Sequence, residues 1–280
     1  MEKLKDARGS IRLIAFDLDG TALNSKKQVS PRTRDALRRA ALEGLLLVTA
    51  TGRQMYDIPP GVVPGIPGIS YAITANGTLT YRLPEGEAVL SHGFSVPDAR
   101  QIISECRGFK AMLHVGYGKA GIFDDRGAAW EDSRLRGEIK ARSCARDLVF
   151  ADTLTELAAW EDPPCKLTLL FFDLAEKERA VLHFLRQPGL TLASSEPTNL
   201  ELTPPNTNKG SAIAFLMERE GLDLRQVMAI GDSHNDMDML SAAGLSVAMG
   251  NAVPALKEMA DAVTASCDED GVALAIEGIL

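Results

Sequence analysis

The chain has few of the residues that would place it in a membrane or outside the cell. Its four cysteines are scattered, with no CxxC pair and no metal-like spacing to the four histidines. No run of eighteen apolar residues occurs, and the first ten residues contain no apolar segment typical of a secretion signal. We therefore expect a cytoplasmic protein with reduced thiols and no membrane partner.

An excess of positive charge is also missing. Lys and Arg number 30 against 38 Asp and Glu, which gives a formal net charge of −8 at pH 7. Nucleic acids attract basic surfaces, so no nucleic-acid partner is expected. What is present, 45% hydrophobic and 24% charged residues, is ordinary for a globular protein. A length of 280 residues suffices for about two domains.

An apolar run from Ile11 to Phe16 ends in two carboxylates, Asp17 and Asp19, which Gly20 and Thr21 follow. The run is typical of a buried strand, whose side chains alternate, so both acids are expected on the same side. Two ionised neighbours repel each other and need a cation or several hydrogen-bond donors. The segment therefore predicts a ligand site at the carboxyl end of a strand in an α/β sheet.

Alternating helices and strands follow. Ser30-Pro31 is a typical helix start, Gly44 a typical stop, and residues 45–50 form a second apolar run. This order predicts a βαβ unit with a parallel sheet and a right-handed crossover. A third strand over 71–75 ends in Asn76-Gly77, a turn signal that predicts a hairpin arm over 78–82.

The pattern changes between residues 84 and 203. Helices are predicted over 97–106 and 176–186, and strands over 112–115, 121–123, 166–172 and 200–203, the last with one face exposed. We therefore predict an α+β domain at 84–203, inserted into a Rossmann-like parallel-sheet core made of residues 1–83 and 204–280.

The core pattern then resumes with Lys209 before a helix, and with a strand over 226–230 that leads into Gly231-Asp232 and on to Asp236. Each polar cluster alone has an ordinary explanation as a turn, a helix cap or a solvated charge. Together, three acids, Lys209 and Thr51 at one edge of a sheet predict a site for Mg²⁺ and phosphate. Mg²⁺ prefers carboxylate oxygens and water, and phosphate needs donors.

These motifs resemble those of the haloacid dehalogenase superfamily, and most closely its Cof-like phosphatases. The resemblance covers Asp17-Leu18-Asp19-Gly20-Thr21, Thr51-Gly52-Arg53, Lys209, the segment 231–236 and, near the end, the segment 247–252. It implies an insert at the second of two cap positions, the type IIB cap, which would close over the core and select the leaving group. It also implies a phosphatase for a small phosphorylated metabolite such as a sugar phosphate.

The resemblance also implies roles for individual residues. Asp17 is expected to attack phosphorus and form an aspartyl-phosphate. Asp19 is expected to protonate the leaving alcohol and then to activate water. Mg²⁺ is expected on the carboxylates of Asp17 and Asp232 and on the backbone carbonyl of Asp19.

Further expectations concern phosphate and the residues around it. Thr51 and Lys209 would hold the phosphoryl oxygens. Asn235 and Asp236 would orient Lys209, the phosphate or metal-bound waters, whereas His234 has no catalytic role and belongs on the surface.

The inserted domain offers weaker candidates for substrate contact, for which a solvated surface position is the ordinary explanation. They are His114, Tyr117, Lys119, Arg126, Arg134 and Arg136. Two alternatives to the phosphatase stay open: a phosphomutase resembling phosphomannomutase, and a non-catalytic phosphate-binding regulatory protein.

Overall fold

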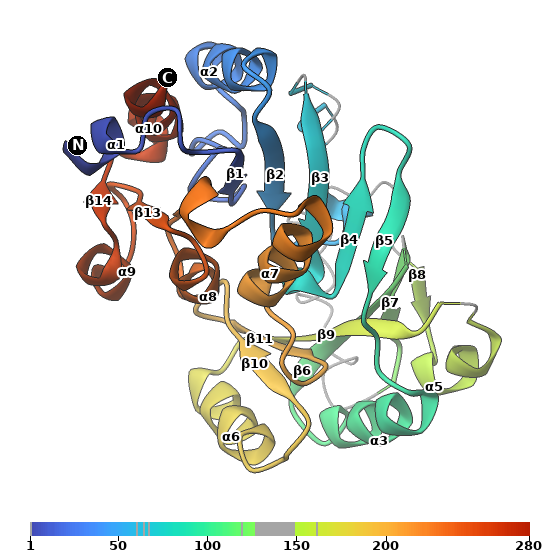
Figure 1. Ribbon diagram of the computed structural model, residues 1–280. Helices are drawn as coiled ribbons and strands as arrows, with labels where there is room; N and C mark the ends of the chain where they lie inside the picture. Colours follow the sequence, from blue (N-terminus) through green and yellow to red (C-terminus); the bar gives the residue numbers. More distant parts are fainter. Residues whose placement is uncertain are drawn as a thin grey trace. The chain divides into compact units, whose positions relative to one another are not determined.

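The computed structural model describes residues 2–59, 61–63, 65–66, 68–118, 120–126, 149–160 and 162–280 (Figure 1). The chain divides into two compact units. Unit 1 comprises Met1–Gly52, Pro59–Leu90 and Asn208–Leu280, and unit 2 comprises Arg53–Ile58 and Ser91–Thr207. None of the described helices is long and apolar enough to cross a membrane.

Unit 1 contains an eight-stranded sheet in the order β14-β13-β12-β1-β2-β3-β4-β5. The pairs from β14 to β3 are parallel and β3–β4 is antiparallel, which confirms the predicted parallel sheet and hairpin arm. Two helix pairs, α2 with α10 and α7 with α8, pack beside this sheet (Figure 1). The strands are β1 (Leu13–Phe16), β2 (Leu46–Ala50), β3 (Ile69–Thr74), β4 (Leu79–Arg82), β5 (Glu87–Ser91), β12 (Val227–Gly231), β13 (Leu245–Ala248) and β14 (Ala262–Val263). The helices are α1 (Glu2–Asp6), α2 (Pro31–Leu42), α7 (Lys209–Glu220), α8 (Met237–Ser241), α9 (Pro254–Met259) and α10 (Gly271–Ile279).

The start of α2 follows from its sequence. Ser30 is extended, its hydroxyl accepts a hydrogen bond from the Thr33 backbone N–H, and Pro31 is the first helical residue. One face of the helix, which includes Ala36, Leu37 and Ala40, is buried. Only this crossover helix lies between β1 and β2, as the sequence predicted, so the two strands are direct neighbours in register.

Unit 2 contains a six-stranded sheet in the order β10-β11-β9-β6-β7-β8. Helices α3 and α6 lie on the same side of it (Figure 1), and their apolar residues share one core cluster with the sheet. The strands are β6 (Ala111–Tyr117), β7 (Ala120–Asp124), β8 (Val149–Ala151), β9 (Pro164–Phe171), β10 (Thr191–Ala193) and β11 (Asn199–Thr203), and the helices are α3 (Val96–Cys106), α5 (Thr153–Glu156) and α6 (Leu174–Phe184).

Three features differ from the sequence-based expectations. The predicted insert begins at residue 84, but β5 extends the sheet of unit 1 to Ser91. The segment Arg53–Ile58 belongs to unit 2, although its position in the sequence suggested the core. All five residues of β11 are buried, so the expected exposed face is wrong: Glu201 is buried because it pairs with Lys166 at 2.8 Å.

Candidate active site

The side chain of Lys209 is fully buried between two carboxylates in unit 1. Its Nζ lies 2.8 Å from Asp17 Oδ1 and 2.6 Å from Asp236 Oδ1. Burial by itself would lower the pKa of the ammonium group, but the two carboxylates raise that pKa above its ordinary value. The two carboxylates therefore favour the charged form of Lys209 at the carboxyl end of β1.

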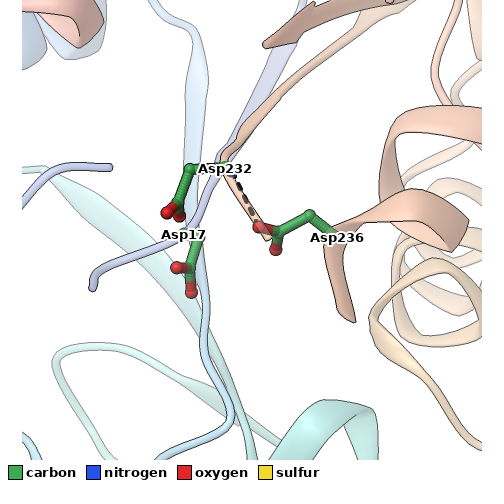
Figure 2. A group of neighbouring side chains, drawn as sticks. All are labelled: Asp17, Asp232 and Asp236. Carbon is green, nitrogen blue, oxygen red and sulfur yellow. Dashed lines mark hydrogen bonds between the residues drawn. The ribbon is translucent and has the colours of Figure 1, made fainter. Parts of the chain in front are cut away.

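The carboxylates of Asp17, Asp232 and Asp236 lie near one another, as Figure 2 shows. Each offers a carboxylate oxygen, and these oxygens all lie within 4.8 Å of one another. Burial raises the pKa of Asp17 well above its usual value, the two neighbouring acids raise it further, and Lys209 opposes them. Burial, together with Asp236, also raises the pKa of Asp232 to about 6. Hard carboxylate oxygens that gain from a nearby positive charge suit a divalent cation such as Mg²⁺.

Asp236 also holds the turn that follows β12. Its Oδ2 accepts hydrogen bonds from the backbone N–H groups of Asp232 at 2.9 Å and Ser233 at 3.0 Å. One carboxylate thus contacts both Lys209 and the loop that carries Asp232. His234, which follows Ser233 in the chain, is exposed.

Asp19 has different surroundings from Asp17. Strand β1 ends at Phe16, before both acids, so strand alternation does not place them on one side as the sequence suggested. The Asp19 side chain is about a third exposed, and its Oδ1 lies 2.7 Å from Lys27 Nζ. The sequence reasoning missed Lys27, whose position in a polar loop carries no signal of this contact.

The loop after Asp19 is packed tightly against Asp232. Gly20 has a φ of +73°, and a Cβ added there would lie 2.3 Å from Asp232 Oδ2, so glycine is required. Thr21 Oγ1 donates to Asp232 Oδ1 at 3.0 Å. Asn251 Nδ2 donates to the Gly20 carbonyl at 2.8 Å. Asn251 is not among the predicted site residues, although Gly250-Asn251 follows a strand as the other motifs do.

Thr51 is buried directly after β2, the strand beside β1. Its backbone N–H donates to the Ile73 carbonyl at 2.9 Å, and its carbonyl accepts from the Asn76 N–H at 3.1 Å. Asn76 adopts a left-handed φ of +57°, and its Oδ1 accepts from Asn235 Nδ2 at 3.3 Å. Asn76, predicted only as a turn residue, therefore links the Thr51 loop to Asn235.

The candidate contacts in unit 2 have varied surroundings. His114 is packed between Tyr56, whose hydroxyl lies 2.6 Å from its Nε2, and the ring of Phe123. Tyr117 stacks on Trp160 with ring centroids 4.1 Å apart. Arg126 is exposed, with a carboxylate oxygen of Asp125 at 3.4 Å. Lys119, Arg134 and Arg136 lie outside the described residues.

Comparison with known proteins identifies relatives over nearly the whole length of the chain. A family model described as haloacid dehalogenase-like hydrolase matches residues 14–276. The phosphatase YwpJ of Bacillus subtilis is 32% identical over 96% of this chain and 100% of its own. The 5-amino-6-(5-phospho-D-ribitylamino)uracil phosphatase YcsE of the same species is 32% identical over 95% of this chain and 94% of its own.

The fold also matches a solved structure. A haloacid dehalogenase-like hydrolase from B. subtilis superimposes with a TM-score of 0.82 at 32% identity, covering 96% of this chain and all of its own. These matches confirm the resemblance drawn from the motifs and the predicted α/β fold.

Proposed function

The chain belongs to the haloacid dehalogenase-like hydrolase family as a phosphatase of the Cof-like kind, and from this premise we propose that it is a Mg²⁺-dependent phosphatase that hydrolyses a small phosphorylated metabolite through an aspartyl-phosphate. The observation that carries the proposal is the buried Lys209 between Asp17 and Asp236, with Asp232 beside them. A cation fixed next to a carboxylate binds and polarises a phosphoryl group.

The residues present fit Mg²⁺. Asp17 and Asp232 supply carboxylate oxygens, and their raised pKa values express the cost of holding crowded, buried acids. We assign the third protein ligand to the backbone carbonyl of Asp19, because its carboxylate pairs with Lys27. When bound, Mg²⁺ neutralises the acids and part of the phosphoryl charge.

Asp17 is the proposed nucleophile. Its carboxylate attacks phosphorus, the ester bond to the alcohol breaks, and the phosphoryl group becomes attached to Asp17. Lys209 and the Thr51 loop hold the non-bridging oxygens, on which negative charge is spread in the transition state. Asp236 keeps Lys209 in place through the 2.6 Å contact.

Asp19 is the proposed general acid and base. It donates a proton to the departing alkoxide and later takes one from the water that hydrolyses the aspartyl-phosphate. Its partial exposure and its contact with Lys27 separate its chemistry from that of the buried Asp17. We place recognition of the alcohol in unit 2, because its sequence carries none of the catalytic motifs.

The substrate class and the compartment are also proposed. The relative YcsE is named for a substrate in which an alcohol of a small metabolite carries the phosphate, and we propose a substrate of that general size. We further propose a reducing, cytoplasmic setting, because Cys106, Cys165 and Cys267 form no disulfide among the described residues.

Hydrolysis of p-nitrophenyl phosphate with Mg²⁺ tests the function. Asp17→Asn should abolish turnover, and EDTA should do the same. Asp238→Asn, which removes an exposed acid from α8 in the same unit, should retain normal rates and serves as the matched control. Robust turnover by Asp17→Asn would refute the nucleophile. Interconversion of hexose phosphates without phosphate release would refute the hydrolase.

A further inference from the structure

Asn251 has no part in the proposed chemistry, yet its side chain joins separate loops of unit 1. It lies in the loop after β13 and is exposed. Its amide nitrogen Nδ2 donates to the Gly20 carbonyl at 2.8 Å and to Asp232 Oδ2 at 3.5 Å. Its amide oxygen Oδ1 accepts from the Cys267 backbone N–H at 2.9 Å. One side chain therefore contacts the loop after β1, the loop after β12 and the loop before α10.

The contact with Cys267 determines which way round the amide lies. A backbone N–H can only donate, so the amide atom that faces it must be the oxygen. The nitrogen then faces the Gly20 carbonyl and the Asp232 carboxylate, which are both acceptors. The amide nitrogen carries two hydrogens, so each of these acceptors can receive one. The orientation of the Asn251 amide is thus set by its partners.

The backbone of the Asn251 loop is held without the help of this side chain. The Met249 N–H donates to the Gly231 carbonyl at 2.9 Å, and the Val253 N–H donates to the Asp232 carbonyl at 2.9 Å. Both hydrogen bonds remain when the side chain of Asn251 is replaced. A substitution at Asn251 should therefore leave the loop in place and remove only the amide contacts.

The Asp232 carboxylate has a donor on each oxygen. Thr21 Oγ1 donates to Oδ1 at 3.0 Å, and Asn251 Nδ2 donates to Oδ2 at 3.5 Å. The second contact is the longer one, and the 2.8 Å hydrogen bond to the Gly20 carbonyl keeps the amide nitrogen in place for it. Donors from two different loops restrict the rotation of the carboxylate, which is one of the proposed metal ligands.

Asn251 also holds the chain beside a second proposed ligand. The backbone carbonyl of Asp19 is joined to Gly20, whose φ of +73° sets the course of the loop. The Gly20 carbonyl, one peptide further on, is the group that accepts the 2.8 Å hydrogen bond from Asn251. One amide therefore restrains the carboxylate of Asp232 and the backbone next to Asp19.

We propose that Asn251 is a positioning residue of the metal site and that it favours Mg²⁺ over the larger Ca²⁺. This inference rests on the Mg²⁺ site of the proposed function. Mg²⁺ requires near-ideal octahedral geometry with oxygens at about 2.0–2.1 Å, whereas Ca²⁺ accepts variable geometry with oxygens at about 2.3–2.6 Å. Ligands that are restrained by their neighbours suit the first ion, and the second ion tolerates ligands that are free to move.

Calorimetric titration of the metal-free protein with MgCl₂ or CaCl₂ tests the proposal without any substrate. Asn251→Leu keeps a similar volume and removes the amide. It should weaken the binding of Mg²⁺ about tenfold, as expected for the loss of a group that orients metal ligands. The binding of Ca²⁺ should weaken by about threefold or less, so the ratio of the two Kd values should fall by about threefold or more. Asn251→Ala should give the same fall.

The matched control is Lys257→Gln. Lys257 Nζ donates to the Gly250 carbonyl at 2.5 Å, so this side chain ties the same loop at the residue before Asn251. Loss of its charge affects two divalent cations alike, and the ratio of the Kd values should not change. If Asn251 served only to tie the loop, Asn251→Leu would resemble this control. Unchanged Mg²⁺ binding in Asn251→Leu, or equal weakening of Mg²⁺ and Ca²⁺, would overturn the proposal.

The binding measurement also separates this inference from the proposed function. If the ratio falls as expected but the unaltered protein hydrolyses no phosphate ester, the phosphatase fails and the assignment of Asn251 stands. If esters are hydrolysed with Mg²⁺ but the Asn251 variants keep the ratio of the unaltered protein, the assignment fails and the phosphatase stands. If the unaltered protein binds no Mg²⁺, both fail.

Discussion

His114 should make unit 2 lose stability in mild acid. Burial depresses its pKa from 6.5 to about 3, and its partners are the Tyr56 hydroxyl, the Phe123 ring and, by charge, Lys166. The unfolded chain therefore binds a proton at a higher pH than the folded chain does. The associated stability is fully present above pH 6.5 and is lost as the pH falls toward the folded pKa.

The size of the effect follows from the unfolded pKa. A pH of 5 lies about 1.5 units below the pKa of the imidazole in the unfolded chain, while the folded ring is still neutral. Each of these pH units lowers the free energy of unfolding by about 1.36 kcal/mol. The free energy of unfolding should thus drop by about 2 kcal/mol between roughly pH 7.5 and pH 5 on account of His114 alone. This value holds for any folded pKa below about 4.

Urea unfolding at about pH 7.5 and at pH 5 measures this drop in the free energy of unfolding. Both tryptophans, Trp130 and Trp160, lie between residues 91 and 207, so their fluorescence reports on unit 2. His114→Gln should remove about 2 kcal/mol of the pH-dependent loss, whereas His234→Gln, at an exposed site of unit 1, should remove none. An unchanged pH dependence in His114→Gln would refute the reasoning.

Three more variants test the packing of the two units. Lys209→Met leaves Asp17 and Asp236 as buried acids without their cation, so urea unfolding in EDTA should show a loss of about 3–5 kcal/mol; a gain in stability would contradict the ion-pair geometry. Gly20→Ala places a Cβ 2.3 Å from an oxygen of the proposed metal ligand Asp232 and requires a left-handed φ. Titration of activity with Mg²⁺ should then show weaker binding by about tenfold or more, with recovery at high Mg²⁺. Gly116→Ala should destabilise unit 2 by about 1–3 kcal/mol, seen in tryptophan fluorescence, because its Cβ meets Gln54; no change would mean that Gln54 does not lie over the sheet.

Local sequence signals predicted the part of the fold that surrounds the candidate active site. Ser30-Pro31 and Gly44 marked the ends of α2 closely, because caps and stops are properties of a few adjacent residues. The apolar runs that end in Asp17, Thr51 and Asp232 marked three neighbouring parallel strands. Since such strands share one carboxyl edge, their last residues converge without any knowledge of distant contacts.

Contacts between distant segments could not be predicted in this way. Glu201 alternates with Leu200 and Leu202 as a solvated residue would, and only the pairing of β11 with β9 brings it to Lys166. Strand β5 (Glu87–Ser91) lies just after residue 84, where the inserted domain was predicted to begin, and it belongs to the sheet of unit 1 only because β4 offers an edge. Such partners depend on tertiary structure.

The two acids of the opening motif show how such contacts give identical residues different chemistry. Asp17 and Asp19 are one residue apart, and the sequence distinguishes them only by the family resemblance. In the structure, Asp17 is buried and contacts Lys209, which lies 192 positions away in the chain. Asp19 is partly exposed and contacts Lys27, which lies in the adjoining loop. A buried carboxylate fixed by a lysine keeps its oxygen in one place, as a nucleophile requires, and a partly exposed one can exchange protons with water. The proposed division of work between the acids therefore rests on their partners rather than on their position on a strand.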